Sequence, residues 1–574
     1  MTNGPLPAKM RRYISFRPRL ADCLRDYTAA DFLRDTVAGV TVGIVALPLS
    51  MALAIASGVA PAAGIYTAVV AGFLISALGG ARVQIGGPTG AFVAIVYGVV
   101  AQHGLANLAI CTVMAGVILL LMGFARMGSM IKFIPHPVTM GFTCGIAVLL
   151  FSTQIKDFLG LRADPFPPDF PGKLAYLFRH GGEIHRPTLL LAVLAVLGMA
   201  LWPARFGRRV PGSIVVIGLA TAAVAWADAG ARFGIETIGS RFGGVPQGLP
   251  PLGLPDFRWD QLADLVRPAT TIALLAAIES LLCAVVSDGM IEDRHDSNQE
   301  LKAQGLANIA SALCGGIPAT GAIARTATNV RSGARSPVAG MIHALTLLAM
   351  MLVAAPLARH IPLAALSAVL VMVAFKMGEW HMFARLPRWP KSDAVVFLTA
   401  FGLTVLVDLT VAVEVGMVLA ALLFIRRIAE TTHVGRLDEA FESDPSRTLS
   451  PAGDVPEGVL VYRIFGAFLF GAADKLETAL KRADQEPRVL VLRMSTVLAM
   501  DATGLNALED LWGKLRRKHR HLVLSGPHTQ PLLVMSRAGF LEQLGHENVC
   551  ANIEHALARA RALLALETPR TSDP

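Results

Sequence analysis

Residues 86–91, Gly-Gly-Pro-Thr-Gly-Ala, and residues 315–322, Gly-Gly-Ile-Pro-Ala-Thr-Gly-Ala, are imperfect copies of one another. Both lie within apolar sequence that is otherwise typical of membrane-spanning helices. A glycine–proline break at membrane depth is tolerated where the backbone is buried in protein or lines a cavity. Paired breaks in matching positions of two halves indicate the binding site of a secondary transporter. The alternative for each break alone is close helix packing through small residues.

The composition places most of the chain in lipid. Of 574 residues, 54% are hydrophobic and only 16% are charged, whereas soluble domains carry about 25% charged residues. Between Thr36 and Ala125 the only charged residue is Arg82, and one span needs about 20 apolar residues. The first 35 residues lack the apolar core of a signal peptide. The six cysteines form no CxxC motif, and we expect neither a metal site nor a disulfide.

The apolar segments form two groups of seven. In each group the third member is short and follows a glycine–proline break. An odd number of spans per half inverts the second copy, so we expect a polytopic all-α membrane protein of 14 spans, built as a 7+7 inverted repeat with two broken half-helices. The expected spans are approximately residues 36–57, 62–81, 88–102, 105–125, 136–157, 187–204, 210–229, 268–288, 301–316, 324–334, 337–357, 361–379, 393–409 and 411–428.

The charges of the loops predict the orientation. Basic residues favour the cytoplasmic side of short membrane loops. With a cytoplasmic N-terminus the inner loops hold arginines such as Arg82, Arg126 and Arg331, and the short outer loops at 58–61 and 103–104 hold none. We therefore expect a multi-pass protein of the bacterial inner membrane with both termini cytoplasmic. This topology also explains most of the net charge of +9, so no nucleic-acid partner is expected.

The sequence predicts five regions. Residues 431–456 are polar and indicate a linker, and 457–566 alternate strand and helix patterns typical of a small α/β domain. The complete division is a cytoplasmic tail at 1–35, a transport domain at 36–430 with repeats at about 36–230 and about 265–430, the linker at 431–456, the α/β domain at 457–566 and a disordered tail at 567–574.

The two breaks predict an anion site. A helix that starts at membrane mid-depth points unpaired N–H groups and a positive dipole end into the cavity, and two such starts can hold an anion without a cationic side chain. The residues expected to contribute are Thr89, Gly90 and Ala91 in the first half, and Ile323 and Ala324 with Gly321 and Ala322 in the second.

Two charged residues flank this site. Arg325 is the only cation between Ala303 and Val330, and a guanidinium at that depth is costly unless it binds something or is paired; we expect it to attract the anion. Glu279 is the only charged residue in the span 268–287, and we expect it to exchange a coupling proton, with Na⁺ as the alternative ion. The structural alternative is a static Arg325–Glu279 salt bridge.

With these residues in view, the chain resembles the SulP family of anion transporters. The resemblance rests on residues 298–301 (Asn-Gln-Glu-Leu), 305–308 (Gly-Leu-Ala-Asn) and 318–325 (Pro-Ala-Thr-Gly-Ala-Ile-Ala-Arg). It implies fourteen spans divided into a core and a gate, a C-terminal STAS domain, a homodimer and an elevator-like movement. Residues 154–161 and 277–286 are most similar to those of the family's bacterial C4-dicarboxylic acid transporters, which implies proton-coupled uptake of succinate-like anions. Sulfate or bicarbonate is the alternative substrate.

The chain departs from the family at two positions near the expected anion. Leu49 replaces a glutamine that several members carry, and Ala324 replaces a frequent serine. In the tail domain, residues 500–505 (Met-Asp-Ala-Thr-Gly-Leu) resemble STAS domains. Related soluble proteins are phosphorylated at the position of Thr503, which makes Thr503 a regulatory candidate and suggests a cytoplasmic protein partner. The alternative is that Thr503 is an ordinary helix cap.

Other function classes receive less support. We find no metal-ligand cluster, no nucleophile beside a base and no nucleotide loop in the apolar region, so we expect no enzyme activity and no cofactor. A channel, or a receptor that signals through the STAS domain, remains the alternative from a different class.

Overall fold

The structure is a computed structural model that describes residues 16–129, 135–162, 166–167, 169–203, 211–226, 232–253, 262–407, 409–431, 433–436, 455–469 and 487–567. The chain divides into two compact units, residues 1–420 and 421–574, and each is described by itself.

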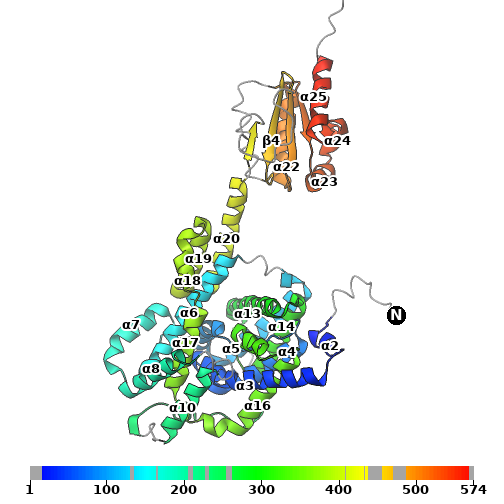
Figure 1. Cartoon of the computed structure of the whole chain (residues 1–574). Coiled ribbons are helices and arrows are strands. Elements are labelled where there is room, and N and C mark those ends of the chain that lie inside the picture. The colour runs from blue at the N-terminus through cyan, green and yellow to red at the C-terminus, as the bar shows by residue number, and fades with distance from the viewer. Residues whose placement is uncertain are drawn as a thin grey trace, which may run out of the picture. The chain divides into compact units, whose positions relative to one another are not determined.

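The first unit is helical (Figure 1). Its first half contains α2 (Arg19–Cys23), α3 (Ala29–Ala56), α4 (Pro61–Leu78), β1 (Gly86–Gly87), η1 (Gly90–Phe92), α5 (Val93–Phe124), α6 (His136–Leu159), α7 (Phe170–His180), η3 (Gly181–Glu183), α8 (Arg186–Ala200), α10 (Gly212–Trp226) and α12 (Ile238–Phe242). Its second half contains α13 (Leu262–Ile291), α14 (Ser297–Leu313), β2 (Thr320–Gly321), α15 (Ile323–Arg331), α16 (Val338–Ala358), α17 (Leu363–Met377), α18 (His381–Arg385), η5 (Leu386–Arg388) and α19 (Lys391–Leu406). The helix α20 (Leu409–Thr431) leads from one unit to the other.

Helices lie at every one of the predicted spans. The third and fourth spans are the two parts of α5, which is interrupted at Gly104, where φ is 83°. A residue with a side chain rarely adopts that conformation, so glycine permits the break. In the described part of the chain, seven helices are long and apolar enough to cross a membrane, or eight if the bent pair 170–183 and 186–200 is one span. The other predicted spans correspond to helices of 9 to 17 residues (α10, α14, α15 and α19) and to α20, which has 23 residues.

The helices of the first unit pack in two groups. The first group consists of α3, α4, α5, α13, α14 and α16, with β1, β2 and α15 between them. In the second group α6 packs on α17 and α19, while α8 packs on α10 and α17. The groups meet where α3 contacts α17 and η1 contacts α6. This division matches the core and gate that the SulP resemblance implies.

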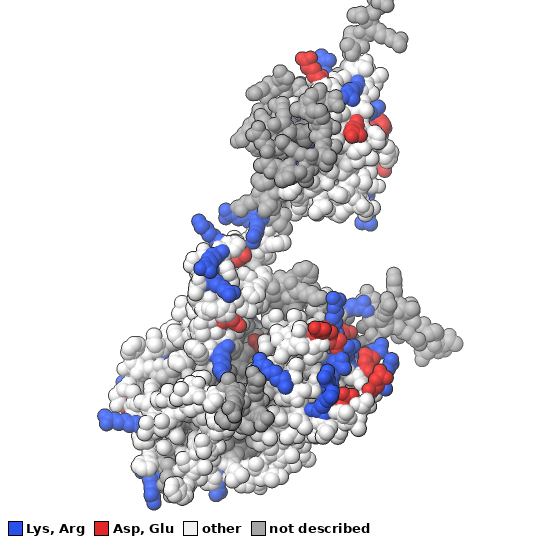
Figure 2. Space-filling model, viewed as in Figure 1, with Lys and Arg blue, Asp and Glu red and all other residues white. Residues whose placement is uncertain are grey.

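The surface of the first unit is suited to lipid. Leucines and valines such as Leu121, Leu190, Val353 and Leu398 are exposed. Figure 2 shows a mostly uncharged face, with Lys, Arg, Asp and Glu side chains gathered around α2. Large exposed apolar areas of this kind indicate contact with a membrane.

The second unit contains one five-stranded sheet with the order β3-β4-β5-β6-β7. The strand β3 (His433–Arg436) pairs antiparallel with β4 (Val459–Phe465). The following neighbours β5 (Val489–Thr496), β6 (His521–Ser525) and β7 (Val549–Cys550) are parallel. Helices α22 (Ala502–Arg517), α23 (Thr529–Arg537), α24 (Phe540–Leu544) and α25 (Ile553–Glu567) and the turn η7 (His546–Asn548) complete the described part of the unit.

Regular elements lie within two regions that the sequence predicted to be a tail and a linker. α3 begins at Ala29 and α2 lies within the predicted tail 1–35. β3 lies within the predicted linker 431–456, because the sheet recruits a short edge strand whose polar sequence gave no strand signal. The predicted tail 567–574 lies outside the described residues, apart from Glu567 at the end of α25.

Candidate functional site

The two glycine–proline breaks meet. β1 pairs antiparallel with β2, with Gly86 opposite Gly321 and Gly87 opposite Thr320. The amide of Ala322 adds a hydrogen bond to the carbonyl of Ile85 at 2.8 Å. Gly87 has a φ of 146°, which residues with side chains rarely adopt. The two copies of the motif are therefore joined through their extended lead-in segments.

Each strand leads into a helix start without a side-chain cap. Thr89 precedes η1, Ala322 precedes α15, and neither provides a cap hydrogen bond. The first N–H groups of a helix have no partner within the helix, so the amides of Gly90, Ala91, Ile323 and Ala324 are available to a ligand. Ile323 and Ala324 are exposed, Thr89 and Gly90 are half-buried and Ala91 is buried. The predicted binding residues thus lie at two adjacent helix N-termini.

Arg325 joins the two halves. Its side chain is only 4% exposed, and its Nη2 donates a hydrogen bond to the carbonyl of Pro88. Its Nη1 is buried without a hydrogen-bond partner among the described residues, as is Oγ1 of Thr89. A buried cation with a free donor is costly unless an anion compensates it. The structure places Arg325 between the two helix starts, and its role toward the anion stays a prediction.

Glu279 lies beside the same region and is not paired with Arg325. No ion pair between the two occurs in the described part of the chain, so the static salt bridge is absent there. Glu279 is half-buried on α13. Ala276, three residues earlier, accepts a hydrogen bond from Thr320 at 3.0 Å, and Cys283 Sγ lies 3.2 Å from Oγ1 of Thr326. This spacing places Glu279 on the helix face that contacts β2 and α15.

We call the paired strands β1 and β2, together with the helix starts of η1 and α15, the crossing. A buried hydrogen-bond network beside the crossing was not predicted from the sequence. The carboxylate of Glu300 accepts hydrogen bonds from the amides of Gly80 (2.9 Å) and Ala81 (3.2 Å), from Ser280 Oγ (3.1 Å) and from Gln304 Nε2 (3.0 Å). Ser280 Oγ in turn accepts a hydrogen bond from Gln84 Nε2 at 2.9 Å. The signal available in the sequence was a run of polar residues at the start of an apolar segment.

Two asparagine side chains make hydrogen bonds with the backbone of the segments that lead into β1 and β2. Asn308 accepts a hydrogen bond from the amide of Ala319 at 2.8 Å and donates one to its carbonyl at 2.9 Å. Asn329 donates a hydrogen bond to the carbonyl of Val83 at 2.9 Å. These side chains satisfy backbone groups that irregular structure leaves unpaired.

His343 on α16 is a further buried polar residue near the two strands, and the sequence analysis did not predict it. It is fully buried, and neither ring nitrogen has a hydrogen-bond partner among the described residues. Its Cε1 lies 3.9 Å from the point where a Cβ on Gly72 would be. The same point is 3.0 Å from the carbonyl oxygen of Gly86, so His343 lies close to β1.

Thr503 lies in the second unit and is an exposed residue in the first turn of α22. The interpretation of Thr503 as the helix cap is wrong, because Asp501 caps the helix by accepting a hydrogen bond from the amide of Gly504 at 2.8 Å. The hydroxyl of Thr503 is therefore not needed for capping, and its regulatory role stays a prediction.

In the described residues, no group of three or more His, Cys, Asp or Glu side chains could hold a metal ion. A helical membrane unit with two crossed half-helices, a buried cation and free helix N-termini is the architecture of an anion transporter.

Comparison with known proteins agrees with this class. Residues 32–400 match the sulfate permease family and residues 450–556 match the STAS domain, and the chain belongs to the sulfate permease family. The chain is 40% identical over 537 residues to YvdB of Bacillus subtilis (strain 168), whose name proposes sulfate transport; the match covers 92% of this chain and 98% of YvdB. It is 31% identical over 515 residues to the bicarbonate transporter BicA of Synechocystis sp., covering 86% of this chain and 88% of BicA.

Solved structures share the fold. The transmembrane domain of a cyanobacterial BicA superposes with a TM-score of 0.60 at 28% identity, covering 69% of this chain and 98% of that structure. The structure of SLC26A9 superposes with a TM-score of 0.85 at 18% identity, covering 98% of this chain and 96% of that one. The chain is thus an anion transporter with the SLC26-like membrane fold and a C-terminal STAS domain.

Proposed function

We propose that this protein is a proton-coupled secondary transporter that holds a compact oxyanion between the start of η1 and the start of α15. The observation that carries the proposal is the buried Arg325, whose Nη1 has no partner in the described part of the chain. The free amides of Gly90, Ala91, Ile323 and Ala324 supply the remaining donors. An anion there would be bound by amides and helix dipoles from both halves.

The geometry favours a small inorganic anion over a dicarboxylate. Among the described residues, Arg325 is the single cationic side chain at the crossing. A C4-dicarboxylate presents two separated negative groups, of which Arg325 could compensate only one. The names of the relatives, which refer to sulfate and bicarbonate, point the same way. We therefore place sulfate or bicarbonate before the succinate-like substrate that the sequence resemblance implied, and the transport assay decides between them.

Glu279 is the group that we propose to exchange the coupling proton. It lies on the α13 face that contacts β2 and α15, and it has no ion-pair partner among the described residues. Protonation of Glu279 would remove a negative charge beside the anion, so binding of the anion and of the proton would favour one another. Na⁺ bound at the same carboxylate is the alternative coupling ion.

The test is uptake into proteoliposomes of labelled sulfate, bicarbonate and succinate, each with an inward proton gradient, an inward sodium gradient or neither. We expect accumulation of one inorganic anion above its equilibrium level, driven by protons. Equilibration without accumulation would indicate a channel. Accumulation of succinate alone would reverse the substrate order, and accumulation driven only by sodium would replace the coupling ion.

The remaining parts of the proposal follow the family resemblance. We propose a homodimer in the bacterial inner membrane, with both termini cytoplasmic and with the first packing group moving as an elevator against the second. Single-cysteine labelling from either side tests the orientation, and the mass of the detergent-solubilised protein tests the dimer. A cytoplasmic partner of the STAS domain is likewise a proposal, for which exposed Thr503 is the candidate contact.

A further inference from the structure

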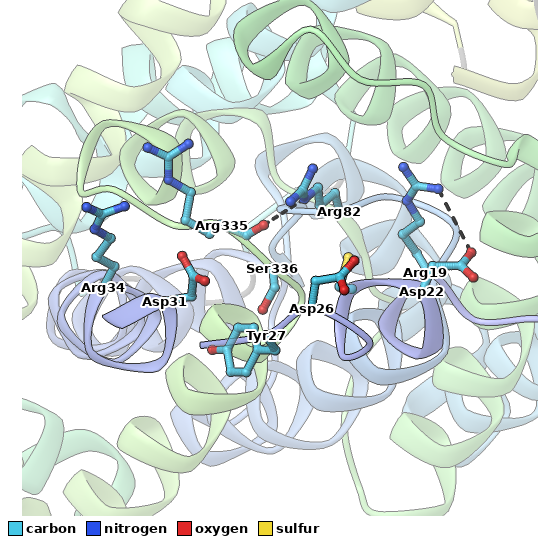
Figure 3. Close-up of a pocket in the computed structure, with 10 residues that line it drawn as sticks. Arg19, Asp22, Asp26, Tyr27, Asp31, Arg34, Arg82, Arg335 and Ser336 are labelled. Carbon is cyan, nitrogen blue, oxygen red and sulfur yellow. Dashed lines mark hydrogen bonds and ion pairs between the residues drawn. The ribbon is translucent and has the colours of Figure 1, made fainter. Parts of the chain in front are cut away.

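A charged cavity lies in the first unit, away from the crossed half-helices. It has a volume of about 460 Å³ and lies between α2, the start of α3, the segment that follows α4 and the segment that precedes α16. Figure 3 shows its arginines extending to the same side, with the carboxylates of Asp22, Asp26 and Asp31 below them. The four arginines are Arg19, Arg34, Arg82 and Arg335.

The walls of this cavity are fixed by buried hydrogen bonds. The buried carboxylate of Asp35 accepts hydrogen bonds from Tyr27 Oη (2.7 Å) and from the amides of Arg335 (2.6 Å) and Ser336 (3.2 Å). Burial and the bond to Asp35 raise the pKa of Tyr27, so it remains a donor. Arg82 Nε donates to the carbonyl of Arg335 at 2.7 Å. The segment that carries Arg335 is therefore held in place before any ligand arrives.

Arg19 is occupied by a carboxylate. Its Nη2 donates to both oxygens of Asp293, at 2.7 and 2.8 Å. Burial raises the pKa of Asp293, but the hydrogen bonds from Arg19 and the amide of Arg294 and the charges of Arg19 and Arg82 together lower it by more. The pKa of Asp293 is therefore below its ordinary value. Asp293 is thus ionised, and Arg19 and Asp293 form a structural ion pair.

Two arginines of the cavity remain without a bonded partner in the described part of the chain. Neither the guanidinium of Arg34 nor that of Arg335 makes an ion pair or a side-chain hydrogen bond with any described residue. Of the acidic residues in the cavity, Asp22 is paired with Arg17 and Asp31 is bonded to Thr28. Asp26 is an unpaired carboxylate among the described residues, and Asp31 also keeps its charge, because Thr28 is a neutral donor; hydrogen bonds from Thr28 and the charges of Arg34 and Arg335 lower the pKa of Asp31. Arg82 lies 4.0 Å from Asp293, which Arg19 already binds. The charges that lack a partner of their own are therefore three positive (Arg34, Arg82 and Arg335) and two negative (Asp26 and Asp31). Unpaired guanidiniums suit the fork geometry of phosphate oxygens.

An apolar stripe starts beside Arg34. Leu33, Val37, Val40 and Ile44 of α3 are 66%, 55%, 37% and 39% exposed, and their spacing places them on one face of the helix. A helical segment of this length extends about 16 Å, which is about half the thickness of the hydrocarbon core. A ligand held at Arg34 can therefore lay an acyl chain along this stripe, whereas a soluble phosphate would leave it unused.

We propose that this cavity binds the phosphate headgroup of an anionic phospholipid from the leaflet on the N-terminal side, with Arg34 and Arg335 as its ligands. Arg335 follows α15, whose first turn carries Arg325, and Arg82 precedes β1 by a few residues. The bound lipid would thus contact the outer ends of both segments that cross at the anion site.

The test measures binding of a fluorescent phosphatidylglycerol to the full-length protein in detergent, with unlabelled competitors. We expect phosphatidylglycerol to compete, phosphatidylcholine to compete at least about tenfold less well, and glycerol phosphate to require a concentration at least about 100-fold higher. Arg34→Gln and Arg335→Gln should each weaken binding about tenfold. The matched control is Arg331→Gln, which removes an exposed arginine that is not among the residues lining the cavity, and it should bind within about twofold of the unchanged protein.

Three results would overturn the proposal. Equal competition by phosphatidylcholine would show that charge is not recognised, and equal competition by glycerol phosphate would show a site for a soluble phosphate. An equal loss in Arg331→Gln would show diffuse attraction by surface charge. Arg34 and Arg335 donate no side-chain hydrogen bonds to described residues, and their attraction to Asp31 is screened by solvent. Their variants should therefore melt close to the temperature of the unchanged protein, so that lost binding cannot be attributed to unfolding.

Discussion

Gly321→Ala tests the crossing of the two half-helices most sharply. A Cβ at this position would lie 2.0 Å from Nε2 of Gln84, 2.9 Å from its Cδ and 3.0 Å from the Cβ of Cys283. The methyl group therefore has to displace the Gln84 side chain, which is buried and donates to Ser280 at 2.9 Å.

The expected change in the free energy of unfolding follows from the lost hydrogen bond and from the additional carbon. Leaving the buried amide of Gln84 without its partner costs about 1–3 kcal/mol. Forcing an additional carbon into a filled site costs about 1–3 kcal/mol more. The free energy of unfolding should therefore fall by about 2–6 kcal/mol, and the pairing of β1 with β2 should be disturbed, so transport should fall as well.

The assay is the apparent melting temperature of the purified protein, together with the initial rate of anion uptake in proteoliposomes. The control is Gly98→Ala, because a Cβ at Gly98 within α5 meets nothing within 4 Å. That change should be neutral or should stabilise by up to about 1 kcal/mol through helix propensity. In the double variant Gln84→Ala, Gly321→Ala the clash is relieved, so it should be more stable than Gly321→Ala alone. Equal stability and transport for the variants at 98 and 321 would refute the described crossing.

Four further predictions concern single side chains. Arg325→Ala removes a buried cation from the anion site at a cost of about 2–5 kcal/mol, so anion affinity in a binding titration should fall at least about 30-fold; unchanged affinity would remove Arg325 from the site. Glu279→Gln should keep exchange of labelled for unlabelled anion but lose accumulation driven by a proton gradient, and accumulation that persists would assign the proton to another group. Burial raises the pKa of Asp293, but Arg19, the amide of Arg294 and the charge of Arg82 together lower it by more, so the pKa lies below its ordinary 3.8. The contribution of Asp293 to stability is therefore present at neutral pH and is lost as the pH falls through its folded pKa, so Asp293→Asn should lower the melting temperature at about pH 7 and have a progressively smaller effect as the medium is acidified below the ordinary pKa; a loss independent of pH would contradict the ion pair. Asp501→Ala removes the cap of α22 and should destabilise the second unit by about 0.5–2 kcal/mol, measured by its unfolding transition; no change would contradict the cap.

The sequence predicted the membrane unit well because lipid imposes simple rules. Long apolar segments with few charges can only be spanning helices, and a glycine–proline break such as 86–91 survives at that depth only where protein or a cavity surrounds it. A helix lies at every predicted span. The lead-in segments also pair with one another as strands, a detail that no local signal contained, because Gly86 and its partner Gly321 are far apart in the chain.

The polar interior was less predictable. Glu300 occurs in a polar run that could equally have been a solvated helix start, and only the fold brings Gly80, Ala81 and Ser280 to its carboxylate. The alternative of an Arg325–Glu279 salt bridge failed for a related reason. Two lone charges in apolar sequence suggest a pair, but Arg325 instead donates to the carbonyl of Pro88.

The boundary of the second unit shows a third limit. β3 is a short edge strand in polar sequence, and edge strands of a few residues carry little hydrophobic periodicity. Its pairing with β4 is a tertiary event that composition does not record. Asp501 and Thr503 illustrate the same limit at one turn of helix, since both can cap a helix and only the backbone decides which does.

We propose that the anion is bound between the start of η1 and the start of α15. The most direct test is an experimental structure of the protein saturated with the anion that it accumulates. We expect density for one anion within hydrogen-bond distance of the amides of Gly90, Ala91, Ile323 and Ala324 and beside Nη1 of Arg325. Density for the anion at any other place, with this crossing empty, would contradict it.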